Sequence, residues 1–277
     1  MSNHIHFIDG VSFRMKEAFD FSFLRKYGRV FKVFDDQDSG NICFGIQGNK
    51  DRYFIKFAGA PTARGCVSPE TAITNLKATV PIYFNLKHPR LIELLDAEEI
   101  GGGFSMIFRW TDGECMGRQY PEAHAHFMSL PIDDKMKVFS DICAFLTHVA
   151  DMGYTAIDFY DGSILYDPAA RQTLICDIDF FRKQPCINDM GRMWGSSRFQ
   201  APEEYELGAA LDEITNVYTL GATAFALFAQ DRREEAFWPL SKQLYRVACT
   251  AVSQNRTERQ QSIRAFMQEW KEACQNT

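Results

Sequence analysis

Aspartates gather in two short segments near the middle of the chain, and their carboxylates could act as a base or bind a metal ion. Asp158 and Asp161 follow a predicted helix, and Asp179 stands a short distance further along. A carboxylate can accept the proton of an attacking hydroxyl, and carboxylate oxygens are ligands that Mg²⁺ prefers. In an arbitrary sequence, however, an Asp in a loop more often caps a turn, and we assign Asp167 and Asp177 to that structural role.

The first part of the chain must supply strands that support such a site. Apolar and β-branched residues bounded by turn residues predict strands over residues 30–34, 42–47, 53–57, 91–95 and 104–108. A helix should begin at Pro69, because Ser68 can cap it and proline suits the first helical position. Five strands and one helix predict a sheet-based first lobe.

The second part of the chain is predicted to be mainly helical. Apolar residues recur at helical spacing from Met136 to Val149, which predicts a helix over residues 133–152 that ends at Gly153. Short strands are expected over residues 163–166 and 173–176, and further helices over residues 215–229, 238–252 and 262–273. The predicted fold class is α+β, with two lobes at residues 1–110 and 111–277.

The motifs of the second lobe follow one another in an order that resembles a known family. Asp158 precedes Ser163, the segment Asp177-Ile178-Asp179-Phe180 comes next, and Ala201-Pro202-Glu203 comes last. This order resembles the catalytic loop, the metal-binding aspartate motif and the A-P-E segment of the eukaryotic-type serine/threonine protein kinases. The resemblance extends over residues 28–267 and implies a bilobal protein-kinase-like fold, with a five-stranded antiparallel sheet and a helix in the first lobe.

The resemblance also implies ATP and Mg²⁺ as cofactors and suggests the residues that contact the nucleotide. Lys56 stands where the family has a lysine that pairs with the ATP phosphates. Phe108 and Trp110 belong to the implied hinge, Ile107 is the implied gatekeeper, and Glu114 is placed to meet the ribose. Without the resemblance, Lys56 would be interpreted as an ordinary solvated lysine on a strand.

Roles in phosphoryl transfer are implied for residues of the second lobe. Asp158 would accept the proton of the substrate hydroxyl, and Ser196 stands where the family has a hydroxyl that hydrogen-bonds this aspartate. Asp179 would hold Mg²⁺ between the phosphates. Ser163 replaces the asparagine that is the family's second metal ligand, and Asp161 could supply the missing oxygen.

Two further positions match structural residues of the family. Asn216 opens a segment that resembles the family's D-V-W-S-L-G helix start, with asparagine in place of the aspartate. Arg259 stands where the family has an arginine that pairs with the glutamate of the A-P-E segment, which is Glu203 here. We expect this ion pair to be buried and to hold the geometry of the lobe.

Departures from the family concern the nucleotide. Residues 35–40 contain three aspartates and one glycine where the family has a glycine-rich loop, whose backbone N–H groups approach the phosphates. Three carboxylates would repel a triphosphate unless the loop tip turns outward or a cation intervenes. Phe54 replaces the small residue above the adenine, so the nucleotide pocket should be tighter or filled.

Other departures concern the partner of Lys56 and the regulation of the site. The position of the helix glutamate that normally meets this lysine is occupied by Thr79, and Glu70 lies more than two turns away on the same predicted helix. Ala156-Ile157 replace the His-Arg pair before the catalytic aspartate. Because that arginine normally binds a phosphorylated activation loop, we expect no activation by loop phosphorylation.

Composition excludes several classes of protein. The net charge is −6, which gives no electrostatic reason to expect nucleic acid or an anionic membrane as a partner. The longest apolar run, at residues 222–229, is shorter than the ~20 residues of a membrane span, and the N-terminus lacks the features of a signal peptide. Eight cysteines without a C-x-x-C pair indicate buried free thiols, and we expect a cytoplasmic protein.

Three functions fit these observations. An atypical kinase that phosphorylates a Ser or Thr hydroxyl of a protein would use Lys56, Asp158 and Asp179 for catalysis. A pseudokinase would keep the fold as a binding module for a regulatory protein partner, as the acidic loop and Phe54 suggest. A small-molecule kinase of the aminoglycoside or choline type is disfavoured, because the A-P-E segment belongs to the docking region for protein substrates.

Overall fold

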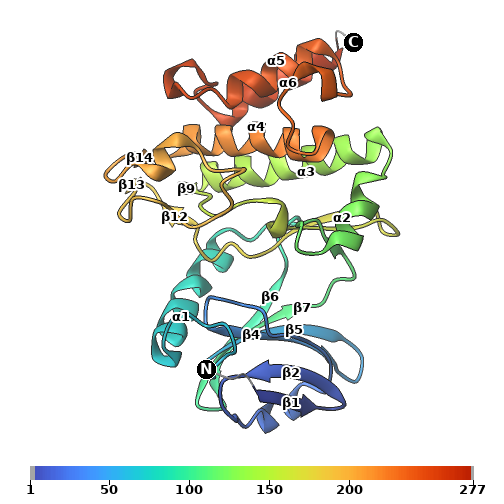
Figure 1. Ribbon diagram of the computed structural model, residues 1–277, viewed down its shortest axis with the longest axis vertical. Helices are drawn as coiled ribbons and strands as arrows, with labels where there is room; N and C mark the ends of the chain where they lie inside the picture. The colour runs from blue at the N-terminus through green and yellow to red at the C-terminus, as the bar shows by residue number, and fades with distance from the viewer. Residues whose placement is uncertain (1–3, 276–277) are drawn as a thin grey trace. The chain divides into compact units, whose positions relative to one another are not determined.

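A computed structural model describes residues 4–275 of the chain, which fold into two compact units (Figure 1). The first unit contains the residues up to Lys87 together with Ile92–Asp112. The second unit contains His88–Leu91 and the residues from Gly113 onward. The order of elements confirms the α+β class, with a sheet and a helix in the first unit and mainly helices in the second.

A five-stranded antiparallel sheet forms the centre of the first unit. Its strands lie in the order β3 (Arg29–Phe34), β4 (Asn41–Gln47), β5 (Arg52–Ala58), β7 (Gly103–Arg109) and β6 (Leu94–Ile100). Central strand β5 places Lys56 opposite Cys43 on one neighbour and Met106 on the other. Successive side chains of a strand point to opposite faces, so Phe54 and Lys56 share one face while Ile55 and Phe57 share the other.

One face of this sheet is covered by an N-terminal hairpin and a short helical turn that the sequence analysis did not predict. Strands β1 (His4–Ile8) and β2 (Val11–Met15) are joined by Asp9 and Gly10, whose φ angles of 51° and 90° are those of a tight hairpin turn. A 3₁₀ helix, η1 (Ser22–Lys26), follows. Together they complete a buried cluster whose members include Phe13, Met15, Leu24, Phe44, Ile55 and Phe57.

The opposite face of the sheet contacts helix α1 (Pro69–Asn85). Its start confirms the prediction, because Ser68 accepts a hydrogen bond from the backbone N–H of Thr71 at 3.2 Å and Pro69 opens the first turn. The Tyr83 ring lies 5.0 Å from the Phe108 ring of β7. These contacts fix α1 on the face of the sheet that carries Lys56.

Two predicted elements have wrong boundaries, because the strand expected over residues 91–95 is Leu94–Ile100 and the helix expected over residues 238–252 is Lys242–Ala251. The strand expected over residues 91–95 begins only at Leu94, because Leu91 forms a parallel bridge with Ile175 and the Arg90 carbonyl accepts from the Ile175 N–H within the second unit. The helix expected over residues 238–252 begins only at Lys242, since Ser241 caps it at that point.

In the part of the chain that the structure describes, the second unit contains five α-helices: α2 (Pro121–Met128), α3 (Ile132–Asp151), α4 (Glu213–Ala229), α5 (Lys242–Ala251) and α6 (Ile263–Gln275). Helix α4 packs against α3, α5 and α6, and its residues from Thr215 to Ala229 are buried. A helix that is apolar on all sides must lie in a core. Aromatic rings close this core, among them Phe139, Phe228 and Trp270.

Short strands of the second unit connect the segments that carry the motifs. Strands β8 (Glu114–Cys115), β10 (Ile164–Asp167) and β11 (Gln172–Ile175) form one small sheet. Strand β9 (Tyr154–Thr155) pairs with β12 (Arg182–Lys183), and β13 (Cys186–Ile187) pairs with β14 (Ala210–Leu211). These pairings hold residues 154–211 in a defined conformation.

No helix among residues 4–275 is long and apolar enough to cross a membrane. The eight cysteines are free thiols, as expected, but the prediction that they are buried was too general. Cys43 and Cys143 are buried, whereas Cys66 and Cys274 are exposed.

Candidate functional site

Asp158 lies in the loop that follows β9, held by apolar neighbours on both sides. Ile157 and Phe159 are 1% and 3% exposed, whereas Asp158 is half-buried. Its backbone has a φ of 61°, a left-handed conformation that non-glycine residues adopt at a cost. The buried side chains of the two neighbours fix this conformation and leave the Asp158 carboxylate partly exposed.

Asn216 of helix α4 anchors the backbone just before this loop. Its side-chain amide donates to the Ala156 carbonyl and its side-chain oxygen accepts from the Ala156 N–H, each at 2.8 Å. Asn216 is fully buried, so both hydrogen bonds are formed away from water. An aspartate could accept from the N–H but could not donate to the carbonyl, which gives a physical reason for asparagine at this position.

Asp177 comes two residues after the end of strand β11, and its backbone φ is also left-handed, at 55°. Strand pairing continues to the preceding residue, because the Cys176 N–H donates to the Ser163 carbonyl at 2.9 Å. Burial first, and then the charges of Asp158 and Asp177, raise the pKa of the Tyr160 hydroxyl. Both carboxylates therefore lie near the same phenol ring.

The sequence analysis assigned the metal role to Asp179 and left Asp177 aside. Asp179 lies two residues later, in a turn that is closed by a hydrogen bond from the Phe181 N–H to the Ile178 carbonyl. Asp177 is exposed; burial first, and then the charges of Asp161 and Asp177, raise the pKa of the Cys115 thiol. The position of Asp177 immediately after a predicted strand was the signal that could have identified it.

Ser163 presents an unpaired hydroxyl at the same place. It ends a short 3₁₀ helix, η2 (Asp161–Ser163), and is 1% exposed. Its Oγ has no hydrogen-bond partner among the described residues, although a buried hydroxyl without a partner is costly. The Ser163 carbonyl accepts from the N–H of Cys176, the residue before Asp177, and a hydroxyl together with a carboxylate would fit a hard cation such as Mg²⁺, which binds few protein ligands and keeps several waters. Within residues 4–275 no cluster of three or more His, Cys, Asp or Glu side chains could hold a metal.

Asp161, the other expected metal ligand, is occupied by an ion pair. Arg198 donates to both of its carboxylate oxygens at 2.8 Å, and the second guanidinium nitrogen of Arg198 contacts Asp231. Burial raises the pKa of Asp161, an effect that the hydrogen bonds from Arg198 offset only in part. Asp161 thus connects the loop of Asp158 to the segment before Ala201-Pro202-Glu203, and its expected role as a metal ligand is not supported.

Gly195 approaches Asp158 closely from that segment. A Cβ atom at Gly195 would lie 3.1 Å from the Asp158 Oδ1 and 3.3 Å from its Cα. The Gly195 φ of 126° is also one that side-chain-bearing residues rarely adopt. Ser196 follows, but its hydroxyl has no hydrogen bond with Asp158 or with any other described residue. The expected Ser196–Asp158 hydrogen bond is therefore not present in this structure.

Replacing Gly195 with alanine should displace Asp158 and strain the backbone. We expect Gly195→Ala to lower the free energy of unfolding by about 1–3 kcal/mol. Gly191→Ala is the matched control, because Gly191 also has a positive φ of 82° but no heavy atom lies within 4 Å of its added Cβ. Urea unfolding of both variants separates the two effects. Equal losses of stability would show that backbone strain, and not the contact with Asp158, causes the change.

Glu204 is a buried acid beside the same loop. It is 3% exposed, and its Oε2 accepts from the Ala201 N–H at 2.7 Å. Burial, followed by the charges of Glu203 and Asp158, raises the pKa of Glu204 from 4.5 to about 8. Glu204 is consequently protonated at neutral pH.

The raised pKa of Glu204 makes the stability depend on pH. The unfolded chain releases this proton near pH 4.5 and the folded chain only near pH 8, so stability falls as pH rises between these values. The slope from this group should reach up to about 1.4 kcal/mol per pH unit. Glu204→Gln should remove that slope, as urea unfolding at several pH values would show. Glu206→Gln, an exposed neighbour, is the control and should keep it.

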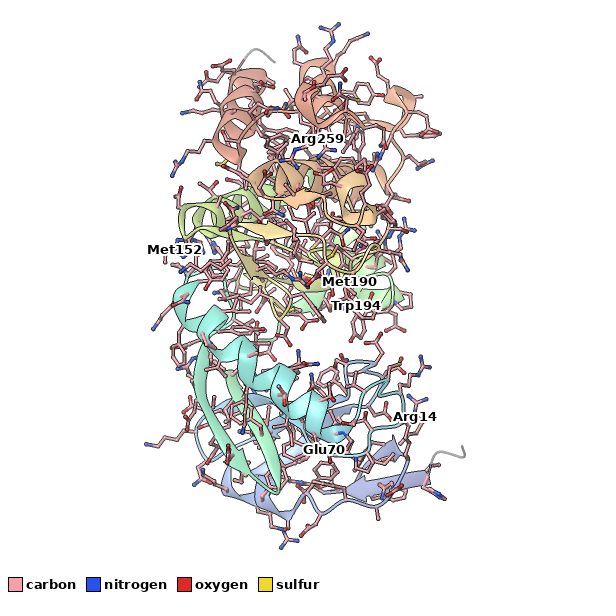
Figure 2. The ribbon with its side chains drawn as sticks, turned by 90° about the vertical axis from the view of Figure 1, so that its left-hand side faces the viewer. Arg14, Glu70, Met152, Met190, Trp194 and Arg259 are labelled. Carbon is pink, nitrogen blue, oxygen red and sulfur yellow. The ribbon has the colours of Figure 1, made fainter. Side chains whose placement is uncertain are left out.

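Lys56 is buried in the first unit, on the face of the sheet that contacts α1. It is 8% exposed on β5, and Thr79 of α1 contacts the sulfur of Met106, the residue opposite Lys56. Thr79 therefore takes the position where the family has its glutamate. Glu70 lies in the exposed first turn of α1 (Figure 2).

Aromatic rings fill the same face next to Lys56. The Phe54 ring lies 5.6 Å from Phe34 and 6.2 Å from Phe108. Phe108 in turn contacts α1 through Tyr83. The face of the sheet beside Lys56 is thus lined by aromatic rings.

Arginines of the first unit neutralise the acidic loop. Arg14 of β2 donates from its backbone N–H and its guanidinium to Asp35 at 2.7–3.0 Å, and its guanidinium lies 3.5 Å from Asp36. Arg64 forms a second ion pair with Asp36. The hydrogen bonds from Arg14 hold the pKa of Asp35 below its usual value. Arginines of the chain itself therefore offset the negative charge of this loop. An intervening cation was one of the two conditions under which the loop was expected not to repel a triphosphate.

The other residues expected to contact a nucleotide lie on β7, just after it, and on β8. Ile107 pairs with Ile55 in the cluster beneath the N-terminal hairpin, so its side chain faces away from Lys56, a placement that does not favour the expected role as gatekeeper. Trp110 lies edge-on to Phe31 at 4.8 Å. Glu114 lies on β8 in the second unit, where its carboxylate contacts the Nδ1 of His126 at 2.8 Å.

The predicted ion pair between Glu203 and Arg259 is confirmed. Arg259 donates to both carboxylate oxygens of Glu203, at 2.7 and 3.0 Å, and its side chain is fully buried. Glu203 also accepts from the Thr215 hydroxyl at 2.9 Å. The pair therefore connects the A-P-E segment to the start of α4.

No protein-family model matches the chain, and no curated protein matches it at a significant level. What the site can do is therefore inferred from its geometry and from the motifs.

Proposed function

We propose that the chain is a protein-kinase-like phosphotransferase that uses ATP and Mg²⁺ to phosphorylate a Ser or Thr hydroxyl of a protein. The observation that carries this proposal is the grouping of Asp158, Asp177 and the unpartnered Ser163 hydroxyl around one loop. Asn216 anchors the backbone of that loop from a buried helix. Phosphoryl transfer needs positioned charges more than covalent chemistry, and this arrangement supplies them.

Asp158 is the proposed base. A partly exposed carboxylate with a fixed backbone can accept the proton of a substrate hydroxyl and orient that hydroxyl for in-line attack. Gly195 permits the close approach of the following segment to this carboxylate. Lys56 of the first unit is the proposed cation for the ATP phosphates, because it matches the lysine on the third strand of the kinase family.

Asp177 and Ser163 are the proposed ligands for Mg²⁺, with Asp179 as the alternative carboxylate. When bound, Mg²⁺ would offset the negative charge that develops on the phosphates. The buried Ser163 hydroxyl gains a partner in this arrangement, which would compensate for its lack of one within the chain. Asp161 has no part in it, because Arg198 uses both of its oxygens.

A protein substrate is favoured over a small molecule by the segment after Gly195. Arg198 and the Glu203–Arg259 pair fix this segment to the loop of Asp158 and to the helical core. A fixed segment beside the base suits the recognition of an extended polypeptide.

A pseudokinase that serves as a binding module is the second candidate, and two observations favour it. The rings of Phe34, Phe54 and Phe108 line the face of the sheet beside Lys56. The loop over residues 35–40 is held by Arg14 and has no row of glycines for phosphate contacts.

A thermal-shift titration of the full chain with ATP separates these candidates. A ligand well above its dissociation constant must stabilise the state that it binds, by about 2.7 kcal/mol at a hundredfold excess over that constant. We expect stabilisation by millimolar ATP that increases when Mg²⁺ is added. The absence of any shift, with ATP and Mg²⁺ together, would rule out the phosphotransferase and leave the binding module.

A further inference from the structure

Six large apolar side chains are exposed around the segment that approaches Asp158. They come from residues 180–207 of the second unit, and we call them the apolar surface: Phe180, Ile187, Met190, Trp194, Tyr205 and Leu207. Their exposed fractions range from 38% for Phe180 to 74% for Leu207. Isolated exposed apolar residues are ordinary, but a group on one segment indicates a binding surface.

The apolar surface is held in place by buried polar contacts. Asn188 is fully buried, and its side-chain amide donates to the carbonyls of Gly191 and Glu203. Its backbone N–H donates to the Ala209 carbonyl, and its own carbonyl accepts from the Gly208 N–H. The loop that carries Met190 and Trp194 is thereby fastened to the segment that carries Tyr205 and Leu207, which makes it a preformed surface.

The same contacts place the apolar surface next to Asp158. Gln200 donates to the Trp194 carbonyl at 3.0 Å and accepts from the Tyr205 hydroxyl at 2.8 Å. Trp194 directly precedes Gly195, the residue in close contact with Asp158. Trp194 and Met190 belong to one loop of the second unit (Figure 2).

Two unpaired cations belong to the same stretch of sequence as these apolar residues. Lys183 and Arg192 are exposed, and neither forms an ion pair or a side-chain hydrogen bond with the described residues. Arg182 is neutralised by Asp189 at 2.8 Å. The exposed carboxylate of Glu206 lies between Tyr205 and Leu207, so the surface is positive on its 182–192 side only.

We propose that the apolar surface docks the protein segment that carries the acceptor hydroxyl, and that this segment combines a large apolar residue with an Asp or Glu. The apolar residue would pack on Trp194 and its neighbours, and the carboxylate would face Arg192 and Lys183. This inference rests on the proposed phosphotransferase function, because Asp158 defines where the hydroxyl must lie. It specifies the class of substrate, an acidic and apolar polypeptide segment.

An immobilised library of peptides with a central serine or threonine, varied at the flanking positions, tests this proposal. Binding of the full chain and phosphate transfer from ATP are measured separately on the same library. We expect peptides with Leu or Phe together with Asp or Glu to be bound best. Trp194→Ser and Leu207→Ser should each weaken this binding by about tenfold or more.

Charge reversal gives a second variant that does not depend on the apolar residues. Arg192→Glu should weaken the binding of acidic peptides about fivefold and favour peptides with Lys or Arg instead. Phe7→Ser, at a 73% exposed position in the first unit, and Lys271→Glu, on α6, are the controls and should change neither preference.

The two readouts keep the inference and the proposed function apart. Selective binding without phosphate transfer supports the docking surface and contradicts the phosphotransferase. Transfer without selection of acidic and apolar peptides, or with selection that survives Arg192→Glu and Leu207→Ser, overturns the inference and leaves the phosphotransferase intact. If the chain neither binds these peptides selectively nor transfers phosphate to them, both the docking surface and the phosphotransferase are overturned.

Discussion

Arg259→Met should lower the free energy of unfolding by about 3 kcal/mol, because it removes the bidentate partner of the buried Glu203 carboxylate and leaves only Thr215 and a longer contact with Arg256 at 3.5 Å. Arg259 is fully buried and donates to both oxygens of Glu203 and to the Ser253 carbonyl. Burial alone would raise the pKa of Glu203, yet the hydrogen bonds from Arg259 hold it below its usual value. Without Arg259, Glu203 stays buried but loses the hydrogen bonds from Arg259 that lower its pKa.

Urea unfolding measures this change, and two further variants test its cause. Arg264→Met breaks an exposed pair with Asp151 and should cost less than about 1 kcal/mol. The double variant Arg259→Met with Glu203→Leu should recover part of the lost stability, since no unpaired charge then remains buried. If the double variant were less stable than Arg259→Met alone, packing and not the unpaired charge would explain the loss.

Asp158→Asn should reduce phosphate transfer by about 10²–10⁴-fold, the contribution expected of a positioned general base. The amide keeps the size of the side chain but cannot accept the substrate proton. Stabilisation by ATP with Mg²⁺ should be unchanged, because Asp158 is proposed to contact the hydroxyl and not the metal. Initial rates of transfer to a peptide, combined with thermal shifts, measure both quantities.

Asp177→Asn should instead remove the part of the ATP stabilisation that depends on Mg²⁺, and phosphate transfer with it. Asp179→Asn is the informative comparison, since the order of the motifs had implied Asp179 as the metal ligand. Asp167→Asn is the control, because Asp167 accepts from the N–H groups of Ala169 and Ala170 at the end of β10. A Mg²⁺ effect lost in Asp179→Asn but kept in Asp177→Asn would return the metal role to Asp179.

Most of the second unit could be predicted from sequence because its signals are local. The apolar stripe from Met136 to Val149 specifies α3 almost to the residue. The Glu203–Arg259 pair was predicted from the resemblance to the kinases, and its burial followed from the need of a buried charge for a partner.

It was harder to predict which of two neighbouring residues belongs to the candidate site, because this depends on which face of a strand is buried. Ile107 was expected beside the nucleotide, but a shift of one position on β7 turns a side chain to the other face. Asp177 and Asp179 are both acidic and two residues apart, so motif order could not separate them. Only the pairing of Cys176 with Ser163 shows where the strand ends.

The N-terminal hairpin was missed although its signal was present. Asp9-Gly10 between alternating apolar residues is a strong hairpin signal, and Asp9 and Gly10 adopt the required positive φ angles. The contact between Arg14 and Asp35 could not be predicted, because it joins residues whose distance in space depends on the docking of the hairpin.

The hairpin also determines how the first unit can be produced in isolation. A fragment that starts at Gly28, where the resemblance to the kinases begins, would lack Phe13, Met15 and Leu24. The outer side chains of the central strands would then face water as a continuous apolar area, and such areas cause aggregation. Expression boundaries for this chain should therefore be drawn before His4 and not at the limits of the motif match.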